Sequence, residues 1–186
     1  MVSDQRVAHV CHLYPYKNVN QFLEAIELLC RRYDPVSLDD VIGHAKTGKK
    51  LKKGSFLLTF DDGFSQMHSV VAPILYEKGL PAVFFLNSSF IDNTAMAHKN
   101  KASLIIEGMI GNDGSIKLVM DVLGCPNVYS PDEAKRRVLS VPFRNTAVLD
   151  RIAERIGINF DEYLKEVQPY LNKGQVRSMI KQGFCF

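Results

Sequence analysis

The feature that most constrains the fold is a short apolar run, Phe56-Leu57-Leu58, that leads into two adjacent carboxylates. Gly54 precedes the run, and Thr59-Phe60-Asp61-Asp62-Gly63 follows it. A short segment of bulky apolar residues is typical of a buried strand in a mostly parallel sheet. Ligand-binding and catalytic groups in open α/β sheets and α/β barrels gather at the carboxyl ends of the strands. The position of Asp61 and Asp62 therefore predicts a functional site.

The carboxylate pair allows two interpretations. Adjacent negative charges repel each other, so a bound cation or proton would relieve the pair. Gly63 can also adopt backbone conformations that other residues avoid. The structural alternative is a solvated Asp-Asp-Gly turn between a strand and a helix. Spacing alone leaves both interpretations open.

The remaining pattern is rich in helices and poor in strands. After the first motif, a helix over 70–78 that Gly79 ends leads to a second strand over 82–86. A further strand is predicted over 7–14, and Phe184-Cys185-Phe186 resembles the opening of another. Gly111 to Gly114 is predicted to be a turn. Helices are predicted from periodicity and capping residues over 20–33, 37–45, 102–110, 147–156, 160–171 and 173–182, with one more beginning at Ser130.

This count of strands predicts an incomplete domain. A closed α/β barrel needs about eight parallel strands, and the 186 residues supply far fewer. An open sheet edge would remain, which a partner chain or self-association could cover. The alternative is a small α/β domain with an appended helical layer.

Three stretches together resemble the polysaccharide deacetylase family, the NodB-like carbohydrate esterases. They are Phe56 to Phe64 with its T-F-D-D-G sequence, Ala72-Pro73-Ile74-Leu75, and Lys78 to Leu86 with its Gly-x-Pro-Ala-x-Phe-Phe sequence. The resemblance is close over residues 54–93. It implies an α/β fold, namely an incomplete NodB-like distorted (β/α) barrel with a helical insertion.

The resemblance also implies an organisation for the whole chain. Residues 1–186 would form a single, truncated deacetylase-like domain. Its parts would be an N-terminal βα segment (1–53), the family core (54–93), a helical insertion (94–172) and the start of the next βα unit (173–186).

The activity that the resemblance implies is metal-dependent hydrolysis of a carbon–nitrogen bond, removing acetyl groups from an N-acetylated carbohydrate. Asp61 would be the general base, and Asp62 would be a ligand of a divalent metal, zinc or cobalt. The family's other metal ligands are two histidines of a His-x-x-x-His motif on the next strand, and residues 175–186 resemble only the approach to that motif. Whether the isolated chain is an enzyme therefore stays open. The alternatives are a non-catalytic truncated chain and a glycosyltransferase that uses the two aspartates as a metal–nucleotide anchor.

The chain's own histidines are weak substitutes for the missing ligands. On the predicted strand, His9 and His12 would point to opposite faces, which argues against a metal pair. His12 lies at the end of that strand and could approach the carboxylates, although a packed or surface imidazole is the simpler interpretation. His44, His68 and His98 have no evident partner in the sequence.

Composition excludes several classes of partner and location. The net charge of +3 is too small to indicate a nucleic-acid partner, and no apolar run is long enough to span a membrane. Met1 to Arg6 lacks the apolar core of a signal peptide, which predicts a cytoplasmic protein. The cysteines at 11, 30, 125 and 185 include no Cys-x-x-Cys and are predicted to be reduced thiols.

Overall fold

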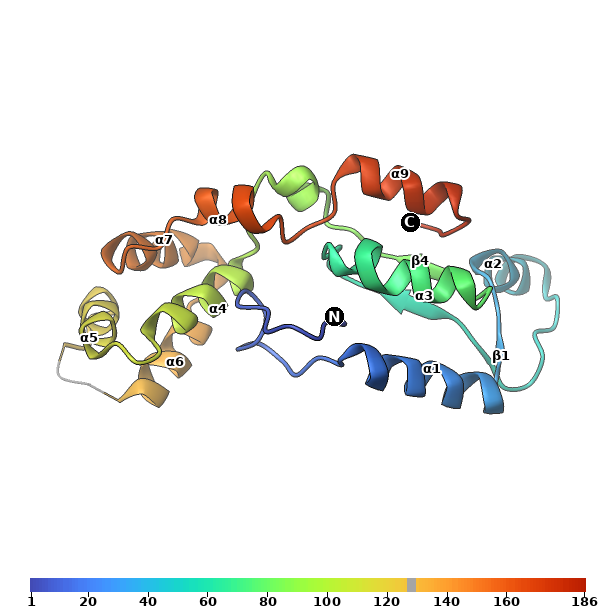
Figure 1. Ribbon diagram of the computed structural model, residues 1–186, viewed down its shortest axis with the longest axis horizontal. Coiled ribbons are helices and arrows are strands. Elements are labelled where there is room, and N and C mark those ends of the chain that lie inside the picture. The colour runs from blue at the N-terminus through green and yellow to red at the C-terminus, as the bar shows by residue number, and fades with distance from the viewer. Residues whose placement is uncertain (127–129) are drawn as a thin grey trace. The chain divides into compact units, whose positions relative to one another are not determined.

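The computed structural model describes residues 1–126 and 130–186 and contains two compact units (Figure 1). Unit 1 consists of Met1–Gln5, Tyr16–Thr94 and Gln168–Phe186. Unit 2 consists of Arg6–Pro15 and Ala95–Val167. The chain therefore crosses between the units several times, and each unit is assembled from segments that are distant in sequence.

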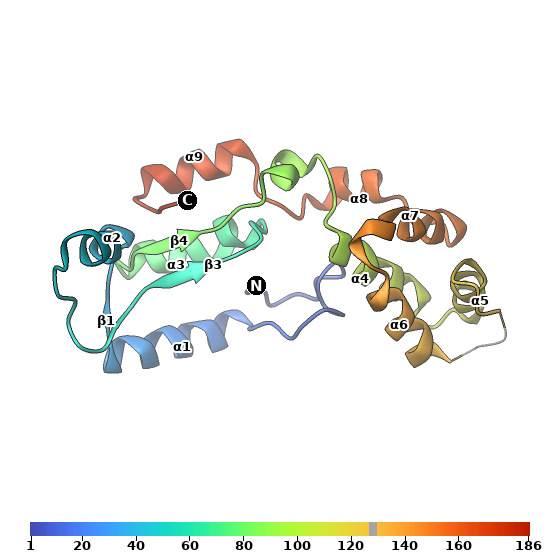
Figure 2. The same ribbon diagram turned by 180° about the vertical axis from the view of Figure 1, so that it is seen from behind.

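The strands of unit 1 are short and parallel. β1 (Asp34–Pro35) pairs with β2 (Ser55–Phe56), and β3 (Leu58–Phe60) pairs with β4 (Ala82–Phe84). Only Leu57 separates β2 from β3, so one extended segment pairs first with β1 and then with β4. Figure 2 shows β3 and β4 side by side. On the other edge of β4, Cys185 forms a parallel bridge with Val83.

Helices flank these strands in unit 1. They are α1 (Val19–Arg32), α2 (Leu38–Thr47), a π-helical turn (Met67–Val71) that continues into α3 (Ala72–Glu77), a 3-10 segment (Ser88–Asn93) and α9 (Lys173–Lys181). Three of them begin with a capping box, in which the N-cap side chain and the third helical residue satisfy each other's backbone N–H groups. The N-cap residues are Asn18, Ser37 and Asn172.

The core of unit 1 lies between the strands and α1, α3 and α9. Leu75 of α3 and Phe84 of β4 are almost completely buried, as is Met179 of α9. Full burial of a side chain of this size contributes roughly 1.5–3 kcal/mol. This packing fixes β3 and β4 against their helices and therefore fixes the residues that follow each strand.

Unit 2 is helical in its described residues. It contains α4 (His98–Met109), α5 (Asp113–Val122), α6 (Pro131–Ser140), a 3-10 turn (Phe143–Asn145), α7 (Thr146–Arg155) and α8 (Phe160–Val167). Ile105, Met120 and Leu149 from three of these helices meet in one apolar core. Across the described residues of both units, no helix combines the length and the apolar character needed to cross a bilayer.

The strand predicted over 7–14 is wrong. Residues 8–13 form successive turns instead, in which the N–H groups of Val10 and Cys11 both donate to the carbonyl of Val7. The physical reason is tertiary: Asn100 and Ser103 of α4 donate side-chain hydrogen bonds to backbone carbonyls in this segment. These hydrogen bonds take the place of the backbone hydrogen bonds that a strand would make with a neighbouring strand.

Other boundaries also differ from the predictions. The turn expected at 111–114 is largely the start of α5, because Asn112 caps a helix that includes Asp113 and Gly114. α8 ends at Val167, earlier than expected, because Gln168 has a left-handed backbone (φ 47°). Phe184-Cys185-Phe186 contributes a single bridge in place of a strand.

The structure agrees with the predicted α/β class but does not show the predicted barrel. Parallel strand pairs combined with helices are compatible with an α/β fold. The strands of the described residues do not close into a barrel, since each sheet contains two strands. The NodB-like barrel and the four-part division of the chain therefore stay predictions.

Candidate functional site

Asp61 and Asp62 lie where the sequence places them, directly after β3. The neighbouring strand β4 ends beside them, because the N–H of Phe85 donates to the carbonyl of Phe60 at 2.7 Å. The two carboxylates therefore stand at the carboxyl end of a parallel strand pair. Both aspartates are exposed to solvent.

The backbone of this turn is unusual at two consecutive residues. Asp62 has φ 73° and Gly63 has φ 67°, both in the left-handed region. Asp tolerates this region better than most residues with a side chain. At Gly63 a second restriction applies, since an added Cβ would lie 2.8 Å from Cδ2 of Leu86. Both the backbone conformation and the neighbouring Leu86 side chain therefore favour glycine at this position.

Hydrogen bonds hold the turn from its far side. The N–H of Leu171 donates to the carbonyl of Gly63 at 2.8 Å, and the N–H of Ser65 donates to the carbonyl of Pro169 at 2.9 Å. Phe64 between them is buried and stacks on Tyr170. The segment before α9 thus fixes the direction in which the chain leaves the two aspartates.

The surroundings of the pair disfavour the charged form of Asp62. Desolvation by surrounding protein atoms raises the pKa of Asp62, and the charge of Asp61 raises it further. The amino group of Met1 acts in the opposite direction. Although the Asp62 residue is exposed by surface area, neighbouring atoms therefore already disfavour its charged form. A cation beside Asp62 would reverse this effect.

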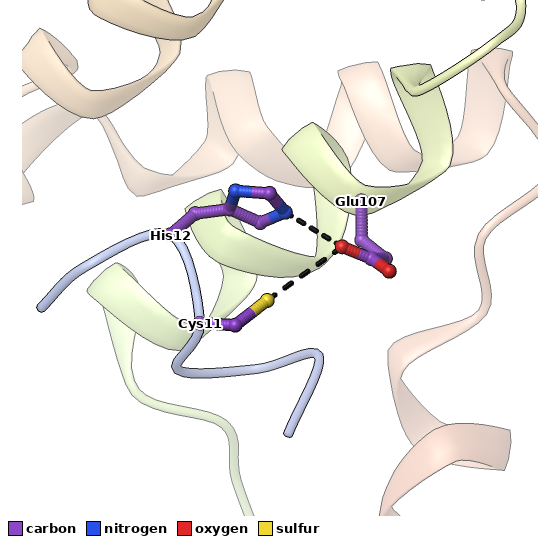
Figure 3. Close-up of side chains that lie close together, drawn as sticks. All are labelled: Cys11, His12 and Glu107. Atoms are coloured by element: carbon purple, nitrogen blue, oxygen red, sulfur yellow. Dashed lines mark hydrogen bonds and ion pairs between the residues drawn. The ribbon is translucent and has the colours of Figure 1, made fainter. Parts of the chain in front are cut away.

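The described residues do not complete a metal site around these aspartates. Among them, one group of three His, Cys, Asp or Glu side chains is close enough to share an ion, and it contains neither Asp61 nor Asp62. The group is Cys11, His12 and Glu107, all in unit 2 (Figure 3). His12, which the sequence allowed to approach the carboxylates, instead pairs with Glu107.

The Cys11–His12–Glu107 cluster converges on one carboxylate oxygen. Nε2 of His12 donates to Oε2 of Glu107 at 2.6 Å, and Sγ of Cys11 lies 3.6 Å from the same oxygen (Figure 3). Arg6 donates to both oxygens, from its Nη2 to Oε2 at 2.7 Å and from its Nε to Oε1 at 2.9 Å. Such bidentate pairing is stronger than a single neutral hydrogen bond.

These contacts shift the pKa values of the cluster in opposite directions. The hydrogen bonds from Arg6 are the main reason that the pKa of Glu107 falls to about 2. Burial raises the pKa of Cys11, and the charge of Glu107 adds to that effect. The cluster therefore contains an ionised carboxylate beside a protonated thiol.

Sequence reasoning missed this cluster because it depends on the turn. On a strand, adjacent residues such as Cys11 and His12 face opposite sides. The turns over 8–13 place both side chains toward α4, and their partner Glu107 lies 95 residues beyond His12. The Cys-His pair was the available signal, but nothing in the sequence named its partner.

Three of the other four histidines have hydrogen-bond partners. Nε2 of His98 donates to the carbonyl of Val141, so its Nδ1 accepts from the hydroxyl of Thr146. His98 is therefore a buried residue of α4 with two partners, although none was evident in the sequence. Nδ1 of His44 bonds to the carbonyl of Lys49. His9 contacts Tyr163, and His68 is part of the π-helical turn.

The region around β3 is similar to known proteins. Residues 48–137 match the family model described as polysaccharide deacetylase. The chain is also 36% identical over 63 residues to the poly-beta-1,6-N-acetyl-D-glucosamine N-deacetylases of Escherichia coli K12 and of Escherichia coli O157:H7. That alignment covers 34% of this chain and 9% of either relative. No solved structure matches the chain.

The family match includes β3, β4 and the aspartate turn between β3 and α3. It also continues past residue 93, where the resemblance seen in the sequence ended, into α6. The comparisons therefore support a partial match to the polysaccharide deacetylase family, over just under half of the chain.

Proposed function

We propose that residues 54–93 form the first catalytic segment of a metal-dependent deacetylase acting on an N-acetylated glycan. The observation that carries this proposal is the placement of Asp61-Asp62-Gly63 at the end of a parallel strand, in a turn whose left-handed backbone favours glycine at position 63. The family match over the same residues supports it. The substrate class follows from the family and from the named activity of the two Escherichia coli relatives.

The two aspartates would have different roles. Asp62 would donate a carboxylate oxygen to a divalent cation, zinc or cobalt, because the local environment disfavours its charge unless a cation is present. Asp61 would accept the proton of the attacking water. The cation itself supplies Lewis acidity and lowers the pKa of a bound water. Gly63 and Leu86 would keep the turn in the geometry that both roles need.

The described residues fit only part of such a metal site. A catalytic zinc usually has three protein ligands and one open position, and the aspartate turn offers Asp62 with Asp61 beside it. The remaining ligands would have to come from protein outside the described residues. We therefore expect no metal-stimulated acetate release from this chain alone, on either β-1,6-linked or β-1,4-linked N-acetylglucosamine oligomers.

A chimera tests the proposal directly. Residues 54–93 replace the corresponding segment of an active polysaccharide deacetylase, and acetate release and bound zinc are measured. We expect an active chimera in which Asp62→Asn loses zinc, whereas Asp61→Asn keeps zinc and loses turnover. Glu77→Gln is the matched control, since Glu77 is an exposed carboxylate at the far end of α3. Equal loss of zinc in both aspartate variants would refute the division of roles.

The second candidate function is a non-catalytic deacetylase-like chain. It is favoured by the absence of a third ligand near Asp62 among the described residues. A folded chimera that binds zinc but releases no acetate would support it. In that case the sheet edges become the functional surface, and we expect concentration-dependent self-association in sedimentation of the chain itself.

A further inference from the structure

We propose that Cys11, His12 and Glu107 form a second metal site, which takes Zn²⁺ in preference to Mg²⁺ or Ca²⁺ and is independent of the aspartate turn. The three ligand atoms are Sγ of Cys11, Nε2 of His12 and Oε2 of Glu107, which all lie within 4.8 Å of one another. All three residues belong to unit 2, so the site is complete within one compact unit.

The donor set favours zinc over harder cations. Thiolate, imidazole and carboxylate are the three ligand types that zinc takes in proteins. Mg²⁺ and Ca²⁺ prefer sets made of oxygen atoms, so the sulfur and nitrogen atoms here select against them. With three protein ligands, a tetrahedral zinc keeps its fourth position for water or another small ligand.

The interatomic distances are close to those that a zinc ion requires. Tetrahedral bond angles with usual zinc bond lengths place the sulfur about 3.6 Å from the oxygen and the nitrogen about 3.4 Å from the oxygen. In the structure, Sγ of Cys11 is 3.6 Å and Nε2 of His12 is 2.6 Å from Oε2 of Glu107. Of these two distances, the one from the imidazole has to lengthen, by about 0.8 Å, which rotation about its side-chain bonds can supply. The sulfur and the nitrogen lie within 4.8 Å of each other.

The backbone that presents these ligands is held in advance. Asn100, Ser103 and Glu107 lie on one face of α4 at spacings of three and four residues. Asn100 donates to the carbonyl of His9 at 2.7 Å, and Ser103 donates to the carbonyl of Ala8 at 2.6 Å. One helix face therefore anchors the turn that carries two ligands and also supplies the third.

Arg6 would become a supporting residue of the metal site. Its Nε donates to Oε1 of Glu107, the oxygen that the metal does not need, whereas its Nη2, which donates to Oε2 at 2.7 Å, would have to move aside when the ion binds. Hydrogen bonds of this kind orient a ligating carboxylate and commonly affect metal affinity. Zinc would displace the thiol proton of Cys11, which leaves to solvent. Nε2 of His12 would also have to give up its proton, so that the neutral imidazole carries its hydrogen on Nδ1. The ion's two charges then balance one thiolate and one carboxylate.

The cluster is buried enough to hold an ion and open enough to admit one. The His12 side chain is 9% exposed, whereas the Glu107 side chain is 30% exposed. An ion can therefore arrive along the carboxylate while the imidazole stays shielded. Bound zinc would link the turn at 8–13 to α4 through direct metal–ligand bonds.

Cobalt spectroscopy tests the site with the full chain under reducing conditions. Co²⁺ bound to a thiolate gives a sulfur-to-cobalt charge-transfer band, which an aspartate site lacks. We expect this band in the wild-type chain at one equivalent of Co²⁺, and we expect Zn²⁺ to abolish it. Absence of the band from the wild-type chain would overturn the proposal without any variant.

Variants identify the ligands. Cys11→Ser should remove the charge-transfer band, and His12→Gln and Glu107→Gln should each weaken zinc binding at least 10-fold. Cys30→Ser is the matched cysteine control, because Cys30 is exposed on α1, and His44→Gln is the histidine control. Asp62→Asn should leave the band unchanged, which separates this site from the proposed deacetylase site. A band that survives Cys11→Ser but is lost in Cys30→Ser would also overturn the proposal.

Discussion

Replacing Gly63 by alanine should destabilise unit 1 through two effects that the structure separates. The first is backbone strain, because φ at Gly63 is 67° and a left-handed conformation costs an ordinary residue about 1–2 kcal/mol. The second is crowding, because the new Cβ would lie 2.8 Å from Cδ2 of Leu86. Moving that flexible, half-buried side chain off its rotamer costs about 0.5–1.5 kcal/mol. We expect a total loss of about 1.5–3.5 kcal/mol in the free energy of unfolding.

Gly79 provides the matched control. Its φ is 63°, but an added Cβ would meet no atom within 4 Å. Gly79→Ala should therefore show the strain alone, about 1–2 kcal/mol. The difference of about 1 kcal/mol between the two variants measures the crowding against Leu86.

Urea unfolding monitored by circular dichroism gives the two free energies. Hydrogen exchange at the Leu171 amide, which donates to the carbonyl of Gly63, gives a local measure of the same turn. In the double variant with Leu86→Ala, the added cost of Gly63→Ala should fall to that of Gly79→Ala. The reasoning would be refuted by equal losses in Gly63→Ala and Gly79→Ala, or by a double variant without any rescue.

Three further predictions concern charge and chain exposure. Because the pKa of Asp62 is raised in the folded chain, the contribution of Asp62 to stability falls as pH rises through the acidic range. Asp62→Asn should therefore raise the urea midpoint at neutral pH. An unchanged or lower midpoint would contradict this prediction. The pKa of Glu107 is lowered from 4.5 to about 2, so its stabilisation is present above about pH 4.5 and is lost as pH falls toward 2. Solvent exposure reduces this stabilisation to about 1 kcal/mol. In an acid titration, Glu107→Gln should therefore lose about that much less stability than the wild-type chain. An identical loss in both would exclude a stabilising role of the Glu107 charge. In limited proteolysis with mass mapping, the first cuts should fall within 94–172, and first cuts within 56–86 would contradict the predicted insertion.

Local sequence signals predicted most helices of unit 1. Asn20 to Tyr33 was expected to be helical and α1 runs from Val19 to Arg32, because its apolar spacing and its cap act over a few residues. Ser37 and Asp40 form the expected capping box. The aspartate turn was likewise predictable, since a strand signal and a glycine define it locally. The left-handed backbone of Asp62 was not, because it depends on contacts with residues beyond 168.

Features that rest on distant contacts escaped prediction. The segment 7–14 has the composition of a strand, but α4 holds it in turns through bonds that span 91 and 95 residues. α5 was missed because Asp113 and Gly114 are common turn residues, although Asn112 caps a helix there. The Cys11–His12–Glu107 cluster required both the turn and α4, so no local pattern could reveal it.

The strap of residues 6–15 gives unit 2 an unusual order of assembly during synthesis. His12 leaves the ribosome first, and its partner Glu107 follows 95 residues later. At about 5–20 residues per second, translation leaves the strap without its docking face for about 5–20 s. During that interval Cys11 and His12 belong to a nascent chain that is open to oxidants, thiol-capping reagents and holdase chaperones. A metal or a chaperone would therefore best reach this protein when α4 emerges from the ribosome. Only then can Glu107 contact the thiol of Cys11.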